Sequence, residues 1–269
     1  MKSLVSMAHL LECIVFLACL AFAPNGLAEM SADEMMEKNF YVTKTKTLVS
    51  EEKMILETDQ GQQRVRDIST QSKLQADGRN LNLVVRFNSP ADVQGTTFLQ
   101  IQNEDRDDDM WIYLPALKKV RRLVSNNKRD SFVGSDFSYG DILTLRPSLF
   151  THVLKGVETV EGAECFRVES VPREESMAGD IGYAHKTTWL RKDNLLEVQI
   201  HYFDEAGVLL KTQTTGEHKL LQSNPPRWIA MNRKMVNHET GHKTSILISK
   251  TDTEEPVKDE AFTSRAIEP

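Results

Sequence analysis

Apolar and polar residues alternate with a period of two along most of the chain after residue 60. In the segment LNLVVRFN at 81–88, every second residue from Leu81 to Phe87 is apolar, and the intervening positions include Asn82 and Arg86. The same alternation recurs at 98–102, 189–192 and 197–202. A period of two is that of a β-strand with one apolar and one solvated face. The pattern therefore predicts a sheet that buries one of its faces.

Short turn sequences separate these strands. Asp77-Gly78, Glu161-Gly162 and the stretch at 204–207 each lie between two alternating segments, and such residues are typical of tight turns. Short loops between successive strands favour an antiparallel meander, either curved or closed. No fixed repeat is present, which argues against a propeller or a solenoid.

One helix is predicted before the strands. Ser31 is a suitable N-cap, and Glu34 three positions later completes a capping-box pattern. Met35, Met36, Asn39 and Phe40 then share one side of this helix at i, i+4 spacing.

Residues 1–28 resemble a cleaved secretory signal. A lysine near the start precedes an apolar stretch, and Gly26-Leu27-Ala28 offers small residues before Glu29. The apolar run at 13–23 is shorter than the ~20 residues of a membrane span. A lipoprotein signal at Cys19 is the competing interpretation, and Phe16 disfavours it because that motif prefers a small aliphatic residue there.

Removal of the signal leaves residues 29–269, which we expect to form a single domain with residues 260–269 as a flexible tail. This part of the chain contains one cysteine, Cys165, in an alternating strand pattern. An exported domain with one cysteine has no internal disulfide and depends on a hydrophobic core. We expect Cys165 to be a packed core thiol.

Composition and motifs argue against several function classes. The net charge of −6 does not favour a nucleic-acid partner. The acidic run at 104–109 fits a solvated turn better than a calcium site, and His238 and His242 lack a third metal ligand. Asp136 and Asp141 lie near serines but suit turns and caps as well as hydrolysis. The sequence predicts no enzyme, no cofactor and no metal.

The segment 109–142 is the most unusual part of the chain. Met110–Leu114 is apolar on both strand faces, which predicts that both faces are covered or that one meets a non-protein ligand. A basic cluster follows, formed by Lys118, Lys119, Arg121, Arg122, Lys128 and Arg129. It is compatible with a solvated strand edge, with a match to the acidic run at 104–109, or with a docking patch for anionic headgroups. Arg121 and Arg122 are consecutive and must point to opposite faces of a strand.

Three short motifs in this segment carry a family resemblance. They are Trp111-x-Tyr113-Leu114-Pro115, Val120-Arg121-Arg122 and the GSDFSY sequence at 134–139. Together they resemble the LolA-like superfamily of outer-membrane lipoprotein-sorting proteins, and more narrowly its periplasmic branch often paired with RND/MMPL-type exporters. The resemblance implies a mainly β fold with few helices. It is a strongly curved antiparallel sheet, or incomplete β-barrel, with helices covering the concave apolar face.

The resemblance also implies a function, which is to carry a lipid or lipoprotein cargo through the periplasm. The groove is expected to be lined by the apolar positions Leu83, Val85, Phe87, Leu99, Ile101, Trp111 and Tyr113. Phe132, Phe137 and Tyr139 are expected to form a movable cover that packs against Trp111 and Tyr113. The rim and docking residues are expected to be Lys118, Lys119, Arg121, Arg122 and Lys128, facing an anionic membrane surface or an RND/MMPL-type exporter.

Two other functions fit the sequence. One is a non-carrier binding or scaffold subunit of the exporter, whose apolar face is permanently covered by its own helices. The other is a lipid-modifying hydrolase.

Overall fold

A single antiparallel sheet of 13 strands dominates the computed structural model, which describes residues 30–268. The first series of strands comprises β1 (Thr47–Glu57), β2 (Gln63–Leu74), β3 (Leu81–Ser89), β4 (Thr97–Ile101), β5 (Asp109–Leu114) and β6 (Lys119–Leu123). The second comprises β7 (Phe150–Val160), β8 (Ala163–Pro172), β9 (His185–Arg191), β10 (Glu197–Phe203), β11 (Leu209–Ser223), β12 (Pro226–Asn237) and β13 (Lys243–Asp252).

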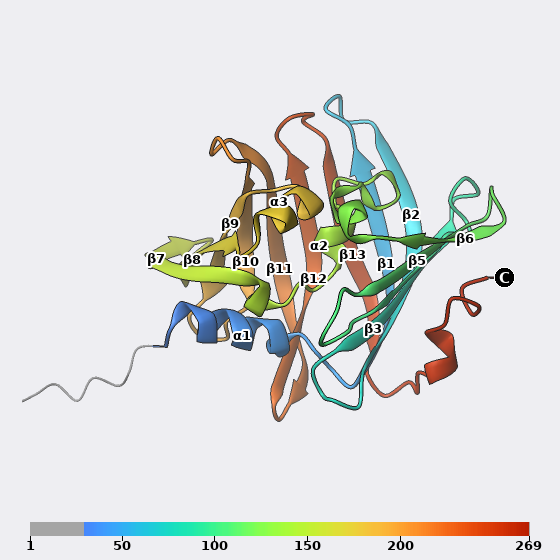
Figure 1. Cartoon of the computed structure of the whole chain (residues 1–269), viewed down its shortest axis with the longest axis horizontal. Helices are drawn as coiled ribbons and strands as arrows, with labels where there is room; N and C mark the ends of the chain where they lie inside the picture. The colour runs from blue at the N-terminus through green and yellow to red at the C-terminus, as the bar shows by residue number, and fades with distance from the viewer. Residues whose placement is uncertain (1–29, 269) are drawn as a thin grey trace, which may run out of the picture. The chain divides into compact units, whose positions relative to one another are not determined.

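The two series meet at the centre of the sheet, where β1 pairs with β13. From this seam the strands follow chain order outward to β6 on one side and reverse order outward to β7 on the other (Figure 1). Among the described residues, β6 and β7 are the two edges, so the curved sheet is not closed into a barrel. The predicted mainly β fold with an incomplete barrel is confirmed.

The predicted first helix is present as α1 (Ala32–Val42). The Ser31 hydroxyl accepts from the Glu34 N–H at 3.2 Å, and the Glu34 carboxylate accepts from the Ser31 N–H at 2.8 Å. This capping box satisfies two amides that the helix itself cannot pair. Met35, Met36 and Phe40 are buried, and the helix contacts β7 and β12.

The connection between the two edge strands spans residues 124–149 and is called the crossing connection here. It contains η1 (Ser125–Arg129), η2 (Phe132–Gly134), the short helix α2 (Tyr139–Ile142) and η3 (Pro147–Leu149). Because β6 and β7 lie at opposite edges, this segment must pass over one face of the sheet, and α2 appears in front of the strands in Figure 1. The helix α3 (Glu175–Ile181) packs against η1.

Two hydrophobic clusters lie on opposite faces of the sheet. The inner cluster joins strand residues such as Val85, Phe98 and Ile246 to Phe132 and Phe137 of the crossing connection. The face that holds it is called the inner face, and the opposite one the outer face.

The outer cluster joins Val84 and Leu99 to Val257, Phe262 and Ile267. The last three belong to the C-terminal segment 253–268, which includes η4 (Asp259–Ala261). Ile267 is completely buried. The segment expected to be a flexible tail is thus packed on the outer face of the sheet, where its apolar side chains Phe262 and Ile267 are buried.

Cys165 is buried beside Trp189 and Val198, as expected for a core thiol. Burial raises the pKa of its thiol, which disfavours the reactive thiolate. The predicted signal, with Cys19, lies outside the described residues. Among residues 30–268, no helix combines the length and apolar character needed to span a bilayer.

Candidate functional site

A cavity of about 310 Å³ lies on the inner face. Its walls come from α1, from the central strands, from β9–β13 and from the crossing connection. Its apolar lining includes Met36, Phe40, Met54, Ile68, Leu83, Val85, Phe132, Leu143, Ile200 and Ile246. Both its volume and its largely apolar walls are typical of small-molecule sites.

Strand register decides which predicted groove residues reach this cavity. Val85 pairs with Phe98 and Val84 pairs with Leu99, so Leu99 lies on the opposite face from Val85. Leu83 and Val85 line the cavity, and Phe87 is buried in the inner cluster beside it.

The prediction that the remaining four groove residues share that face is wrong. Leu99, Ile101, Trp111 and Tyr113 belong to the outer cluster. The inner positions of β4 and β5 are instead Phe98, Gln100, Met110 and Ile112. Residues 97–100 are all buried, so the sequence of β4 alone does not reveal which parity faces inward.

The predicted cover residues are buried on the inner face. Phe132 and Tyr139 lie 5.6 and 5.4 Å from the Phe98 ring, centroid to centroid. Burial raises the pKa of Tyr139 to about 12. Phe137 is completely buried, and of the three aromatics Phe132 lines the cavity. The expectation that they pack on Trp111 and Tyr113 is wrong, because those residues lie across the sheet.

Three polar contacts attach the crossing connection to the sheet. Arg66 of β2 donates to the Val133 carbonyl at 2.5 Å. The Thr244 hydroxyl of β13 donates to the Asp136 carboxylate at 2.6 Å. Lys211 of β11 forms an ion pair with Asp141. The segment is therefore fastened to three strands around the cavity.

These contacts also account for the acids considered for hydrolysis. Asp141 accepts from the Ser138 N–H at 2.7 Å, as in a helix cap, and pairs with Lys211. Asp136 accepts from Thr244. The structure thus gives both carboxylates structural partners.

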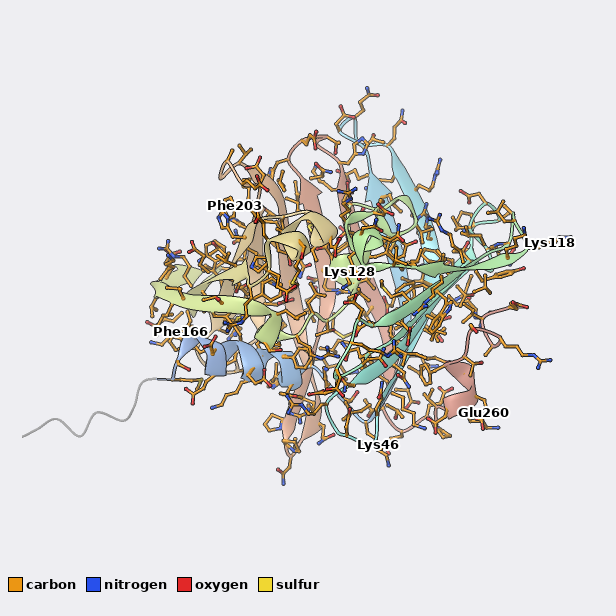
Figure 2. The ribbon with its side chains drawn as sticks, in the orientation of Figure 1. Lys46, Lys118, Lys128, Phe166, Phe203 and Glu260 are labelled. Atoms are coloured by element: carbon orange, nitrogen blue, oxygen red, sulfur yellow. The ribbon has the colours of Figure 1, made fainter. Side chains whose placement is uncertain are left out.

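The members of the basic cluster differ in their exposure and in the face of the sheet on which they lie. Arg121 pairs with Ile112 and Arg122 with Trp111, so the two arginines lie on opposite faces as predicted. Lys118 and Lys119 are exposed, and Figure 2 shows Lys118 at the far tip of the β5–β6 hairpin. Lys128 is buried, which makes its expected role as an exposed docking residue wrong.

The acidic run at 104–109 matches part of this cluster. Asp109 pairs with Arg122 at 2.7 Å and with Arg106, whose hydrogen bond contributes most to lowering the Asp109 pKa to about 2. Lys128 lies 3.6 Å from Asp107. Within residues 30–268, no group of three or more acidic, histidine or cysteine side chains could hold a metal ion.

One side of the cavity is polar. Lys186 of β9, Glu197 and Tyr202 of β10, and Arg233 of β12 line it, and they are called the polar wall here. Burial raises the pKa of Glu197 and Tyr202 and lowers that of Lys186. Smaller opposing contributions from Lys186 and Arg233 lower the Glu197 value.

The polar wall cannot be recognised in the sequence, for a physical reason. Charged positions that alternate with apolar ones predict a solvated face. Yet Tyr202 pairs with Lys186, and Arg233 pairs with Ile246, so these charges lie on the inner face. A charged residue on the inner face of such a sheet alternates with apolar residues in the same way as a charged residue on the outer face, so the sequence pattern does not tell them apart.

A further cation, Lys44, also lines the cavity. The Lys44 ammonium is 3.5 Å from the centroid of the Phe40 ring and donates to the Arg79 carbonyl at 2.6 Å. Burial is the largest of the effects that lower its pKa to about 7. The cavity lining thus contains a cation outside the polar wall as well as those within it.

Comparisons with known proteins agree with this geometry. A family model described as an uncharacterized protein matches residues 80–269. None of the curated proteins matches the chain in sequence.

Two solved structures share 28% of their sequence with this chain, each with a TM-score of 0.80 over 88% of it. One is a domain from Vibrio parahaemolyticus named for outer membrane lipoprotein sorting, which is covered to 98%. The other is a DUF1329 family protein from Desulfovibrio piger, which is covered to 97%.

A LolA superfamily protein from Nitrosomonas europaea is 15% identical, with a TM-score of 0.66 over 87% of this chain and 98% of that one. This more distant similarity shows the fold.

Proposed function

Because this chain belongs to the family of uncharacterized proteins matched by that model and has the fold of the LolA superfamily, we propose that it is a periplasmic carrier for a lipid or an acylated cargo. The observation that carries this proposal is the cavity on the inner face, between the sheet and the crossing connection. The similar domain from Vibrio parahaemolyticus, named for lipoprotein sorting, supports the same function.

The physics of transfer explains why such a cavity is useful. Each buried CH₂ group contributes about 0.8 kcal/mol, so an acyl chain leaves a membrane slowly. A walled apolar site such as that formed by Met54, Leu83, Val85 and Ile246 replaces the lost lipid contacts. Two methionines in the wall suit a site that must accept and release cargo, because their side chains adapt to different shapes.

The crossing connection is proposed as the movable part. It lies over the inner face and contributes Phe132, Gly140 and Leu143 to the cavity lining. A displacement of this segment would open the cavity from the side opposite the strands.

Mass spectrometry tests the carrier proposal. Processed protein purified from the periplasm after gentle lysis is extracted with organic solvent, and we expect a lipid in stoichiometric amount. Delipidated protein should then take up a fluorescent acyl probe. An empty protein that also fails to bind acyl probes would contradict the carrier function and favour a scaffold whose inner face is permanently covered.

The exposed cations of the β5–β6 hairpin are proposed as a docking site for an anionic membrane or an RND/MMPL-type exporter. Lys118, Lys119 and Arg121 are exposed, and long-range attraction of this kind weakens with salt. Vesicle binding at low salt should fall in the Lys118→Glu/Lys119→Glu variant but not in Lys234→Glu, which alters a separate exposed site. Binding that responds neither to reversal nor to salt would leave the hairpin as a solvated strand edge.

A further inference from the structure

We infer that the polar wall binds the anionic headgroup of the cargo, while the apolar part of the cavity holds its acyl chain. The ligand class is therefore an anionic amphiphile with a carboxylate or phosphate head. This inference rests on the proposed carrier function and adds the charge of the substrate.

The two cations of the wall have no acidic partner at contact distance. Within residues 30–268, no carboxylate lies within 4.0 Å of the Lys186 ammonium or the Arg233 guanidinium, and neither group donates a hydrogen bond. Lys186 instead lies 5.2 Å from the Phe150 ring centroid, and Arg233 lies 5.8 Å from that of Phe137. Aromatic faces attract a cation without neutralising it.

The acids nearby do not balance these charges. Asp141 is occupied by its ion pair with Lys211. Glu197 accepts a hydrogen bond from Gln213 at 3.2 Å and lies within electrostatic reach of both Lys186 and Arg233. Lys186 and Arg233 thus share the carboxyl group of Glu197, and burial favours the neutral form of that group. The other carboxylate of the lining, Glu52, accepts a hydrogen bond from the Ser50 hydroxyl at 2.6 Å and makes no ion pair with either cation.

The aliphatic lining next to the polar wall would contact the acyl chain of the ligand. Met54 and Ile246 are paired across the β1–β13 seam, and Ile246 also pairs with Arg233. Aliphatic lining therefore begins one strand away from the cationic group. A ligand that satisfies both regions has a charged head and an apolar chain.

Matched probes test the inference on the delipidated full-length protein. One fluorescent acyl chain is used as the free carboxylic acid, as its methyl ester and as a phosphate monoester. Charge-assisted hydrogen bonds should make at least one of the two anionic probes bind about tenfold or more tightly than the ester. The stronger of the two anionic probes identifies the source of the head.

Substitutions locate the effect. Lys186→Gln and Arg233→Gln should each weaken acid binding by about tenfold and leave ester binding unchanged. Lys234→Gln is the matched control, because Lys234 is adjacent in sequence but exposed. Arg233→Lys should restore part of the acid affinity, and thermal unfolding establishes that each variant is folded.

The outcomes separate the two proposals. Equal binding of all three probes to the wild-type protein would overturn the headgroup inference and leave the carrier function intact. Failure to bind any probe would overturn the carrier function itself. The comparison of acid with ester uses the unaltered protein, so it decides the question even where a variant fails to fold.

Discussion

Lys44, which lines the cavity, should make the stability of the fold depend on pH. Its pKa is lowered from 10.5 to about 7, with burial as the largest cause. Between these values the unfolded chain binds a proton that the folded protein lacks, so the free energy of unfolding rises with pH, by up to about 1.4 kcal/mol per pH unit. Below about pH 7 both states are protonated, so this pH-dependence disappears and the cost of burying the charge is fully present.

Urea denaturation at about pH 6 and about pH 9 measures this coupling. We expect the wild-type protein to be more stable at the higher pH, and the Lys44→Met variant to show a smaller difference. Other groups that titrate in the same pH interval contribute equally to both proteins, so the difference between the two pH profiles reports Lys44 alone. Parallel pH profiles for the two proteins would contradict the assignment.

Leu83 offers a test of the cavity at the scale of one side chain. It lines the cavity and is partly exposed within it, so Leu83→Trp should fill space and weaken acyl-probe binding by about tenfold through lost contacts. Ile101 is similar in size and burial but lies in the outer cluster. The Ile101→Trp control should therefore bind the probe normally, and equal losses in both variants would place the ligand elsewhere.

The contrast between Leu83 and Leu99 shows how far a sequence can predict such a site. Alternation within β3 separates its two faces correctly, because its inner positions are all apolar whereas the other set includes Asn82, Arg86 and Asn88. The face of β4 depends on its register with β3, which the loop geometry sets, and β4 is buried on both parities. Lys186 and Arg233 could not be placed for a related reason, since a cation that faces a cavity has the same sequence pattern as one that faces water.

At the scale of elements, a disulfide between the crossing connection and the sheet tests whether this segment must move for the ligand to enter. The Asp136 and Thr244 side chains already contact each other, so cysteines at both positions are well placed to form a disulfide in a Cys165→Ser background. The oxidised protein should lose probe uptake, and reduction should restore it. The Thr244→Cys single variant controls for the substitution, and full uptake with the disulfide verified by mass would rule out opening at this segment.

The C-terminal segment 253–268 packs on the outer face of the sheet. Phe262 is buried against the outer cluster with Val84 and Leu99. Phe262→Ala should lower the free energy of unfolding by about 3 kcal/mol, as is usual for a core phenylalanine. Thermal or urea denaturation measures the change, with substitution of the exposed Ser264 by Ala as control. Unchanged stability would mean that the segment contributes little to the fold.

The whole molecule depends on contacts that are distant in sequence. The central seam joins residues near 50 to residues near 250, and the crossing connection adds contacts from residues 133–141 to β2, β11 and β13. Sheets built on distant pairings fold slowly, because loop closure precedes the stabilising contacts. We expect refolding on the order of milliseconds to seconds or longer, followed by tryptophan fluorescence in stopped flow. Refolding in microseconds would contradict this expectation.

The pairing of β1 with β13 also determines when the sheet can be completed. Since β1 waits for β13, a chain that enters a compartment from its N-terminus presents twelve strands before the partner of the first arrives. Until then, β1 has one open edge and the inner face is incomplete. If the expected secretory signal directs export of an unfolded chain, this late pairing delays folding. The inner face is then completed only in the compartment that receives the last strand, and the proposed carrier could bind its cargo only there.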